Sequence, residues 1–239
     1  MVHISLIGVP RNLKEAIDWL IALKGTDSES NLKALGAAIT PFDNIKRISK
    51  KFLQQKELRG QLSVDKLLEH FNQRLRSGPS VFAKLFAAVT EHDARSIVQA
   101  KRLGPEDIAK KLSKVVHGTE KFLDDIKNPA HYMSAYSSEA TWDASCAKNP
   151  EACALIFVGI APMLYGGLES LRAVSKDATC YVPHPKSAER LEGVLNAVGY
   201  EEPECRSGMS GSDVLQALRA VDKGLVGIIY DLAGFWAFY

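Results

Sequence analysis

The chain has 239 residues and a formal net charge of only +2, and 46% of its residues are hydrophobic. This composition is ordinary for a globular protein and excludes a chain that is disordered over most of its length. The length is enough for one large domain or two small ones.

The first predicted element is a helix that begins after Asn12. The Asn12 side chain is a good N-cap because it can accept a hydrogen bond from a free backbone N–H of the first turn. Glu15 stands at the third helical position, as in a capping box, and Gly25 directly after Lys24 is typical of a helix end. Apolar residues recur at helical spacing between these two ends.

Four more helices are predicted in the first hundred residues. They cover Ser30–Ile39 and the approximate ranges 45–53, 63–75 and 81–89. The helix at 45–53 carries a basic cluster between Lys46 and Lys51. A solvated helix face is favoured over a nucleic-acid or anionic-lipid site there, because no outward aromatic residues are interleaved and no binding motif is present.

Two strong start signals stand in the middle of the chain. Pro105 follows Gly104 at a favourable first helical position, and the apolar pattern continues to Asn128–Pro129. A helix is also predicted at His131–Ser145. Asn149–Pro150 then opens a helix that is apolar nearly all round, as expected for the middle of a core.

The most apolar run, Ala152–Leu168, lies inside that helix. It is at the lower edge of a membrane-spanning length and contains Pro162, so it is interpreted as a buried core helix and no integral membrane span is predicted. Gly166–Gly167 in the same helix indicates close helix packing rather than a phosphate-binding loop.

The last part of the chain is predicted to hold a loop or short extended piece at Thr179–Pro185. Helices follow at Lys186–Val198, at Ser210–Asp222 and from about Gly224 onward. Only Val2–Val9 and Thr179–Val182 resemble strands, and both are short. The predicted fold class is therefore all-α: a multi-helix bundle or stacked helical array of about 9–11 helices with negligible sheet, forming a single helical unit over residues 1–239.

Charge divides the chain unevenly. Residues 1–130 hold 22 Lys and Arg against 15 Asp and Glu, whereas residues 131–239 hold 8 against 13. We therefore distinguish two sub-regions, basic cysteine-free helices at 1–128 and acidic cysteine-containing helices at 129–239. A basic helical surface balanced by an acidic one is favoured over a basic binding face.

All four cysteines are candidates for disulfide bonds, namely Cys146, Cys153, Cys180 and Cys205. An even number confined to one region indicates two disulfides and an oxidising compartment, although four reduced thiols in an intracellular protein are nearly as well supported. Residues seven apart on one straight helix are too distant for a disulfide. The break at Asn149–Pro150 allows Cys146 to meet Cys153, and Cys180 would then pair with Cys205, but three pairings are possible.

No catalytic, cofactor-binding or metal-binding residues are predicted. The segment Gly208–Ser212 follows the pattern G-x-S-x-G for three residues and then fails, so Ser210 or Ser212 is interpreted as the N-cap of the next helix. The spacing of Cys146 and Cys153 does not fit a zinc site, and Cys180 with His184 lacks a second ligand pair. The aromatic residues fit a core better than a binding surface; they include Tyr132, Tyr136, Trp142 and Trp236.

The segment Pro10–Leu20, which includes N-L-K-E-A-I-D-W, resembles the opening of the variant erythrocyte surface antigen family of Babesia, the tick-borne blood parasites. The Cys146–Cys153 segment and the closing residues Tyr230–Tyr239 are similar to parts of related piroplasm proteins. Close similarity covers about a tenth of the chain. Members of that family are typically longer and end in a membrane helix, and the resemblance supplies no catalytic residues.

The resemblance implies a non-enzymatic parasite antigen at the parasite surface or exported to the infected erythrocyte. Its role would be adhesion and immune evasion, with a host or parasite protein as partner and without nucleic acid. Met1–Pro10 lacks the features of a classical signal peptide, which agrees with that family. The alternatives are an intracellular helical scaffold or adaptor with reduced cysteines and, less favoured, an enzyme or small-molecule carrier with a pocket in the helical core.

Overall fold

The computed structural model describes residues 2–39, 104–179, 186–201, 205–206 and 208–233. These residues form eight α-helices and one short 3-10 helix. The α-helices are α1 (Leu13–Lys24), α2 (Ser28–Ile39), α8 (Pro105–Ile126), α9 (Trp142–Ser145), α10 (Pro150–Ala178), α11 (Ser187–Ala197), α12 (Gly211–Ala217) and α13 (Lys223–Ala233). The 3-10 helix η1 (Leu218–Ala220) lies between α12 and α13.

The predicted all-α class is confirmed. The helices pack closely on one another, and the described residues contain no strand, only an isolated bridge between His3 and Tyr136. The helices predicted at 45–53, 63–75 and 81–89 lie outside the described residues, as do the basic cluster Lys46–Lys51 and the loop at Thr179–Pro185 except for Thr179 itself.

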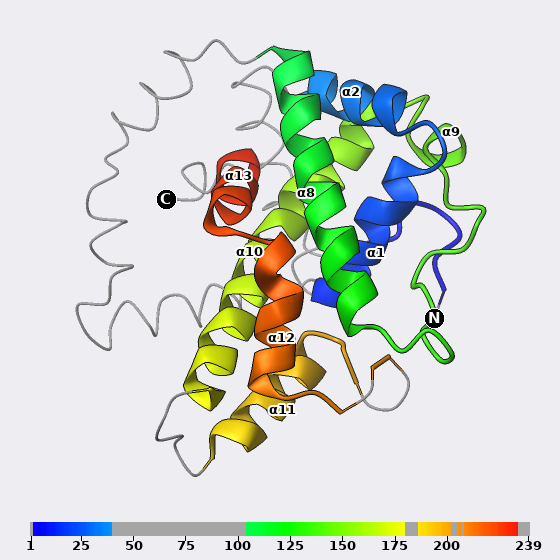
Figure 1. Ribbon diagram of the computed structural model, residues 1–239. Coiled ribbons are helices and arrows are strands. Elements are labelled where there is room, and N and C mark those ends of the chain that lie inside the picture. The colour runs from blue at the N-terminus through cyan, green and yellow to red at the C-terminus, as the bar shows by residue number, and fades with distance from the viewer. Residues whose placement is uncertain (1, 40–103, 180–185, 202–204, 207, 234–239) are drawn as a thin grey trace.

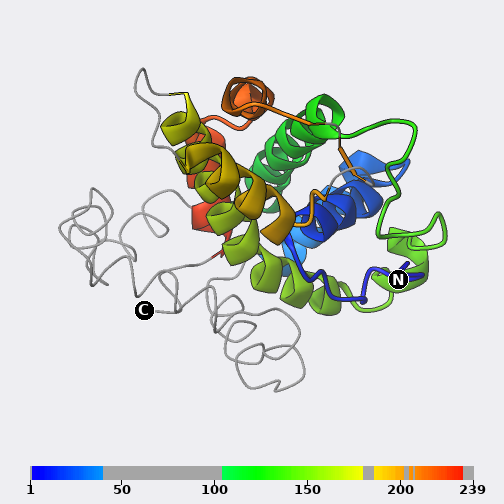
Figure 2. The ribbon, with the colours of Figure 1, turned by 90° about the horizontal axis from the view of Figure 1, so that it is seen from below.

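Helix α10 is the central element of this arrangement. It contacts α1, α2, α11, α12 and α13, and Figures 1 and 2 both show α11 alongside it. It is long and apolar enough to cross a membrane by length and composition, but most of its apolar segment is buried by the other helices. At Gly167 an added Cβ would lie 3.0 Å from the Leu13 side chain, so the glycine allows α1 and α10 to pack closely.

Helix α8 lies beside this core with α1 and α2 on one side and α12 and α13 on the other (Figure 1). Its apolar residues recur at helical spacing and are buried, including Ile108, Leu112, Val115 and Phe122. At Gly36 an added Cβ would lie 2.8 Å from the backbone oxygen of Pro105, so α2 approaches the first turn of α8 very closely.

Three predicted helix starts are confirmed. Asn12 accepts a hydrogen bond from the Glu15 backbone N–H at 2.9 Å, and Gly104 precedes Pro105 at the start of α8. The Ser210 side chain caps α12, and the Asp213 carboxylate in turn accepts a hydrogen bond from the Ser210 backbone N–H at 2.8 Å. Of the two serines predicted as candidates for this N-cap, Ser210 and Ser212, it is Ser210 that caps the helix.

Two predicted boundaries are wrong. Within His131–Ser145 only Trp142–Ser145 is helical, because the residues before Trp142 are held in an irregular, partly extended path by hydrogen bonds to the N-terminal segment and to α1. The predicted helix Ser210–Asp222 is α-helical only over Gly211–Ala217. The 3-10 helix Leu218–Ala220 follows, and α13 begins as a separate helix at Lys223.

Candidate functional site

Three charged side chains of α1 are buried, which is rare unless charged groups are paired. Lys14 is 9% exposed, Glu15 is 7% exposed and Asp18 is 2% exposed. All three belong to the segment Pro10–Leu20. Two segments supply partners for them, the N-terminal segment (residues 2–11) and the connecting segment (residues 131–137) between α8 and α9.

Asp18 is the centre of the first group of contacts. Its Oδ1 accepts a hydrogen bond from the Tyr132 hydroxyl at 2.5 Å. Its Oδ2 accepts hydrogen bonds from the Ala135 backbone N–H at 2.8 Å and from Lys14 Nζ at 3.0 Å. The buried carboxylate therefore has three donors and one positive charge, which is what an ionised carboxylate needs away from water.

Lys14 joins the same contacts from the preceding helical turn. Its ammonium donates to Asp18 and to the backbone oxygen of Met133 at 2.8 Å, and it lies 4.5 Å from the centre of the Tyr132 ring. All of its donors thus point toward an acceptor or an aromatic face. Lys14 and Asp18 together fix the connecting segment against α1.

Glu15 is the centre of a second group of contacts. It accepts hydrogen bonds from the Arg11 backbone N–H at 2.8 Å and from the Arg11 guanidinium at 2.8 Å, and His3 Nε2 lies 3.9 Å away. The expected capping box is therefore incomplete, because the Glu15 carboxylate bonds to Arg11 rather than to the Asn12 backbone. Burial acts to raise the pKa of Glu15, but the hydrogen bonds and charge of Arg11 outweigh burial and lower it.

The N-terminal segment and the connecting segment are also joined to each other. His3 donates its backbone N–H to Ala135 and accepts from Ser137, and its ring stacks on Tyr136 with the centres 4.8 Å apart. The Tyr136 hydroxyl donates to the Gly8 backbone oxygen at 2.5 Å. Trp19 donates from its indole nitrogen to the Leu6 backbone oxygen at 2.7 Å, which fixes the segment to α1 as well.

Burial widens the pH range over which the tyrosines around this cluster stay neutral. It raises the pKa of Tyr132, Tyr136 and Tyr200, and the negative charge of Asp18 or Glu15 raises them further. These hydroxyls are therefore neutral at physiological pH. The buried charged groups Lys14, Glu15 and Asp18 are thus all paired. Their contacts hold α1, the N-terminal segment and the connecting segment together.

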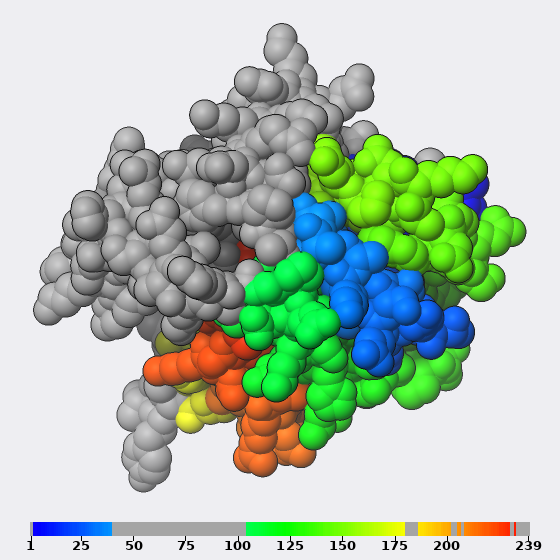
Figure 3. All heavy atoms as spheres, turned by 90° about the horizontal axis from the view of Figure 1, so that it is seen from above, coloured from blue at the N-terminus to red at the C-terminus, as the bar shows by residue number. Residues whose placement is uncertain are grey.

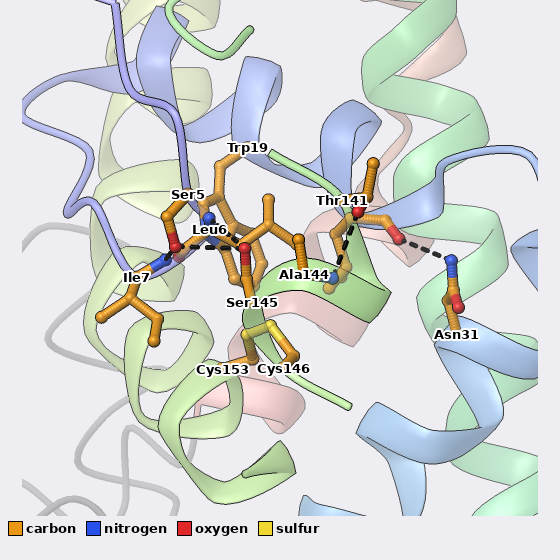
Figure 4. The surroundings of a disulfide bond; sticks show 11 residues. Ser5, Leu6, Ile7, Trp19, Asn31, Thr141, Ala144, Ser145, Cys146 and Cys153 are labelled. Atoms are coloured by element: carbon orange, nitrogen blue, oxygen red, sulfur yellow. Dashed lines mark hydrogen bonds between the residues drawn. A yellow bond between two sulfur atoms is a disulfide. The ribbon is translucent and has the colours of Figure 1, made fainter. Parts of the chain in front are cut away.

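A disulfide joins Cys146, which ends α9, to Cys153 in the first turn of α10. Their Cα atoms are 5.9 Å apart and both side chains are fully buried. Figure 4 shows Ser145 beside this bond with its hydroxyl directed toward Ser5 and Leu6, to which it is hydrogen-bonded at 3.1 and 2.9 Å. The break at Asn149–Pro150 thus permits the pairing predicted from the sequence.

The other two cysteines are not paired among the described residues. Cys205 is half-buried and has no disulfide partner among the described residues, and Cys180 lies outside them, so their pairing stays a prediction. His184 also lies outside them. Within the described ranges no group of three or more His, Cys, Asp or Glu residues is placed to hold a metal ion.

A surface groove of about 490 Å³ lies between the α1–α2 turn, α2 and the residues that lead into α9. Figure 3 shows these two regions side by side, α2 in blue and the residues around α9 in yellow-green. Hydroxyl groups line much of the groove, including Ser30, Ser137, Ser138 and Thr141. It differs from the expected alternative of an apolar pocket inside the helical core, because it lies at the surface and polar and apolar groups line it about equally.

The buried charges of α1 were missed from the sequence. Their i,i+4 spacing, Lys14 to Asp18 and Arg11 to Glu15, is also found in exposed helical ion pairs, so it carries no sign of burial. The one available signal is that apolar residues of α1 stand on every side of them. Comparison with protein-family models, with curated proteins and with solved structures finds no match to this chain.

Proposed function

We propose that the chain is a non-enzymatic surface or exported antigen of a Babesia-like parasite that mediates interaction with the host. The resemblance of Pro10–Leu20 to the variant erythrocyte surface antigen family supports this proposal and names the kind of protein. Adhesion and immune evasion are the corresponding roles, with a protein of the host or the parasite as partner.

The observation that carries the proposal is the buried disulfide between Cys146 and Cys153. Structural disulfides form and persist in oxidising environments and are rare in cytosolic proteins. The bond therefore supports a protein that leaves the cytosol and argues against the main alternative, an intracellular scaffold or adaptor with reduced cysteines.

The contacts of Pro10–Leu20, the segment on which the resemblance rests, fit an antigen with a variable surface. Its charged residues Lys14, Glu15 and Asp18 point into the protein and hold two other segments in place. A segment with that task serves the fold of the protein, so it can be common to proteins whose exposed surfaces differ. The resemblance would then mark a common framework rather than a common binding surface.

Localisation in infected erythrocytes with an antibody against this chain tests the proposal most directly. Signal on intact infected cells, lost after protease treatment of the cell exterior, is the expected result. Signal confined to the parasite interior would favour the intracellular alternative.

A thiol count under denaturing, non-reducing conditions gives an independent measurement on protein isolated from the parasite. We expect two free thiols, or none if Cys180 and Cys205 are also paired. Four free thiols would count strongly against an exported protein, because the buried disulfide would then be absent from the protein in its native compartment.

A further inference from the structure

The solvent-facing side of α8 carries a row of basic residues. Lys110, Lys114, His117 and Lys121 are all exposed. Their spacing of four, three and four residues places them on one side of an α-helix, over a length of about 16 Å at 1.5 Å per residue. We call these four residues the α8 basic row.

The lysines of this row form no ion pair with the acids that the structure describes. Three described lysines outside the row do form ion pairs, Lys33 with Glu106, Lys24 with Glu120 and Lys127 with Asp124. No such pair involves Lys110, Lys114 or Lys121 among the described residues. Like charges four residues apart on a helix, such as Lys110 and Lys114, destabilise it slightly.

A second element adds positive charge beside the row. At Gly118 an added Cβ would lie 2.8 Å from the Ala220 backbone oxygen, so η1 lies directly against α8. Arg219 immediately precedes Ala220, Lys223 begins α13, and both are exposed. The acid between them, Asp222, caps α13 by accepting a hydrogen bond from the Leu225 N–H at 2.7 Å.

Acidic residues bound the row at both ends of the helix. Glu106 and Asp107 stand in the first turn of α8, and Asp124 and Asp125 stand in the last. The positive surface is therefore short and narrow, one helix wide with an extension onto η1. A partner that fits it must carry closely spaced negative charges on a thin chain.

We propose that the α8 basic row, with Arg219 and Lys223, binds a linear sulfated polysaccharide. Sulfate groups along such a chain can pair successively with ammonium and guanidinium groups that are exposed and have no ion pair among the described residues. This inference gives the chemistry of one host partner and rests on the proposed function of host interaction.

Two other polyanions fit this surface less well. A membrane presents a broad flat surface, whereas the row is narrow and ends in acids. The exposed large apolar residues that the structure describes also lie elsewhere, at Val2, Ile4, Ile7 and Met133. Single-stranded nucleic acid is held largely by stacking on aromatic side chains, and the aromatic residue of α8, Phe122, is fully buried.

Heparin immobilised on a sensor surface is the probe, and the full chain is measured at physiological salt. The test variant is K110Q/K114Q/K121Q. The matched control is K33Q/K127Q/K148Q, which removes the same number of charges from exposed or half-exposed lysines outside the row. We expect the dissociation constant for heparin to rise at least about tenfold for the test variant and to change less than about threefold for the control. A lysine close to an anionic surface strengthens binding, and this contribution falls off with distance, so lysines outside the row should matter less.

Equal weakening by both variants would overturn the inference, because binding would then follow net charge alone. Binding of the wild-type chain to phosphatidylserine vesicles or to single-stranded DNA as tightly as to heparin would overturn it as well. Both variants are first checked for unchanged helical circular dichroism and melting temperature.

The same proteins applied to host cells separate this inference from the proposed function. If the test variant still binds cells as the wild type does, host interaction stands and the sulfated partner is wrong. If the wild type binds heparin through the row but does not bind cells, the site stands and the proposed function is wrong.

Discussion

The Tyr132 hydroxyl donates a hydrogen bond to the Asp18 carboxylate at 2.5 Å, across 114 positions of sequence. Together with Lys14 and the Ala135 backbone N–H it surrounds a carboxylate that is almost completely buried. This contact joins the first helix to the middle of the chain, and the stability of the protein should depend on it.

Replacing Asp18 by Asn should lower the free energy of unfolding by about 3–5 kcal/mol, because the Lys14 ammonium then stays buried without its counter-charge. Urea denaturation followed by circular dichroism measures this loss. The control D143N changes an exposed acid and should alter stability by less than about 0.5 kcal/mol. The double variant K14M/D18N should recover part of the loss; if it is as unstable as D18N, the unpaired charge is not the cause.

Replacing Gly199 by Ala should destabilise the protein by about 1–3 kcal/mol, because its φ of +94° strains any residue with a Cβ. The new Cβ would also lie 2.6 Å from the Asn12 side chain that caps α1. The matched control G193A lies in the exposed face of α11 with no atom near the new Cβ, and should stabilise by about 0.5–1 kcal/mol. Thermal unfolding of both variants tests this contrast, and equal shifts would contradict it.

Glu15 should make the protein less stable in acid. Its pKa is lowered in the folded state, so its contribution to stability is fully present above the unfolded pKa near 4.5 and is lost as the pH falls through the lower folded value. E15Q removes this titration, so its free energy of unfolding should fall less steeply below about pH 4.5. The exposed E139Q serves as a control and should keep the wild-type slope, and an E15Q slope equal to that of the wild type would refute the prediction.

Removing the disulfide with C146S/C153S should lower the free energy of unfolding by about 2–2.5 kcal/mol, the value expected for the short loop that it closes. The melting temperature of the wild type should then fall on addition of reductant, and that of the double variant should fall less. C205S leaves the Cys146–Cys153 bond intact, so its melting temperature should still fall on addition of reductant. A double variant that melts at the wild-type temperature would show that the bond contributes no stability.

The parts of the fold that sequence predicted best are those decided within a few residues. Asn12, Pro105 and Ser210 each mark a helix start through a local hydrogen bond or a fixed backbone angle, and each was placed correctly. The pairing of Cys146 with Cys153 belongs to the same class, since the break at Asn149–Pro150 permits it.

The predictions that failed depend on distant partners. Residues 131–141 have a sequence compatible with a helix, yet the hydrogen bonds that they form with Asp18 and His3 hold them in another path. The burial of Lys14, Glu15 and Asp18 has the same origin, because the segments that cover them are far away in sequence or lie outside the helix. No pattern within α1 carries that information.

The contact between α1 and the connecting segment also determines when α1 can fold during synthesis. The Asp18 carboxylate and the Ala135 N–H are 117 positions apart, so at about 5–20 residues per second α1 leaves the ribosome on the order of 5–25 s before its partners. Until the connecting segment has been synthesised, Lys14 and Asp18 stay hydrated and α1 cannot be buried in the core. Helix α1 is therefore synthesised early but packs late. The nascent protein must keep this helix from aggregating until the second half of the chain has been synthesised.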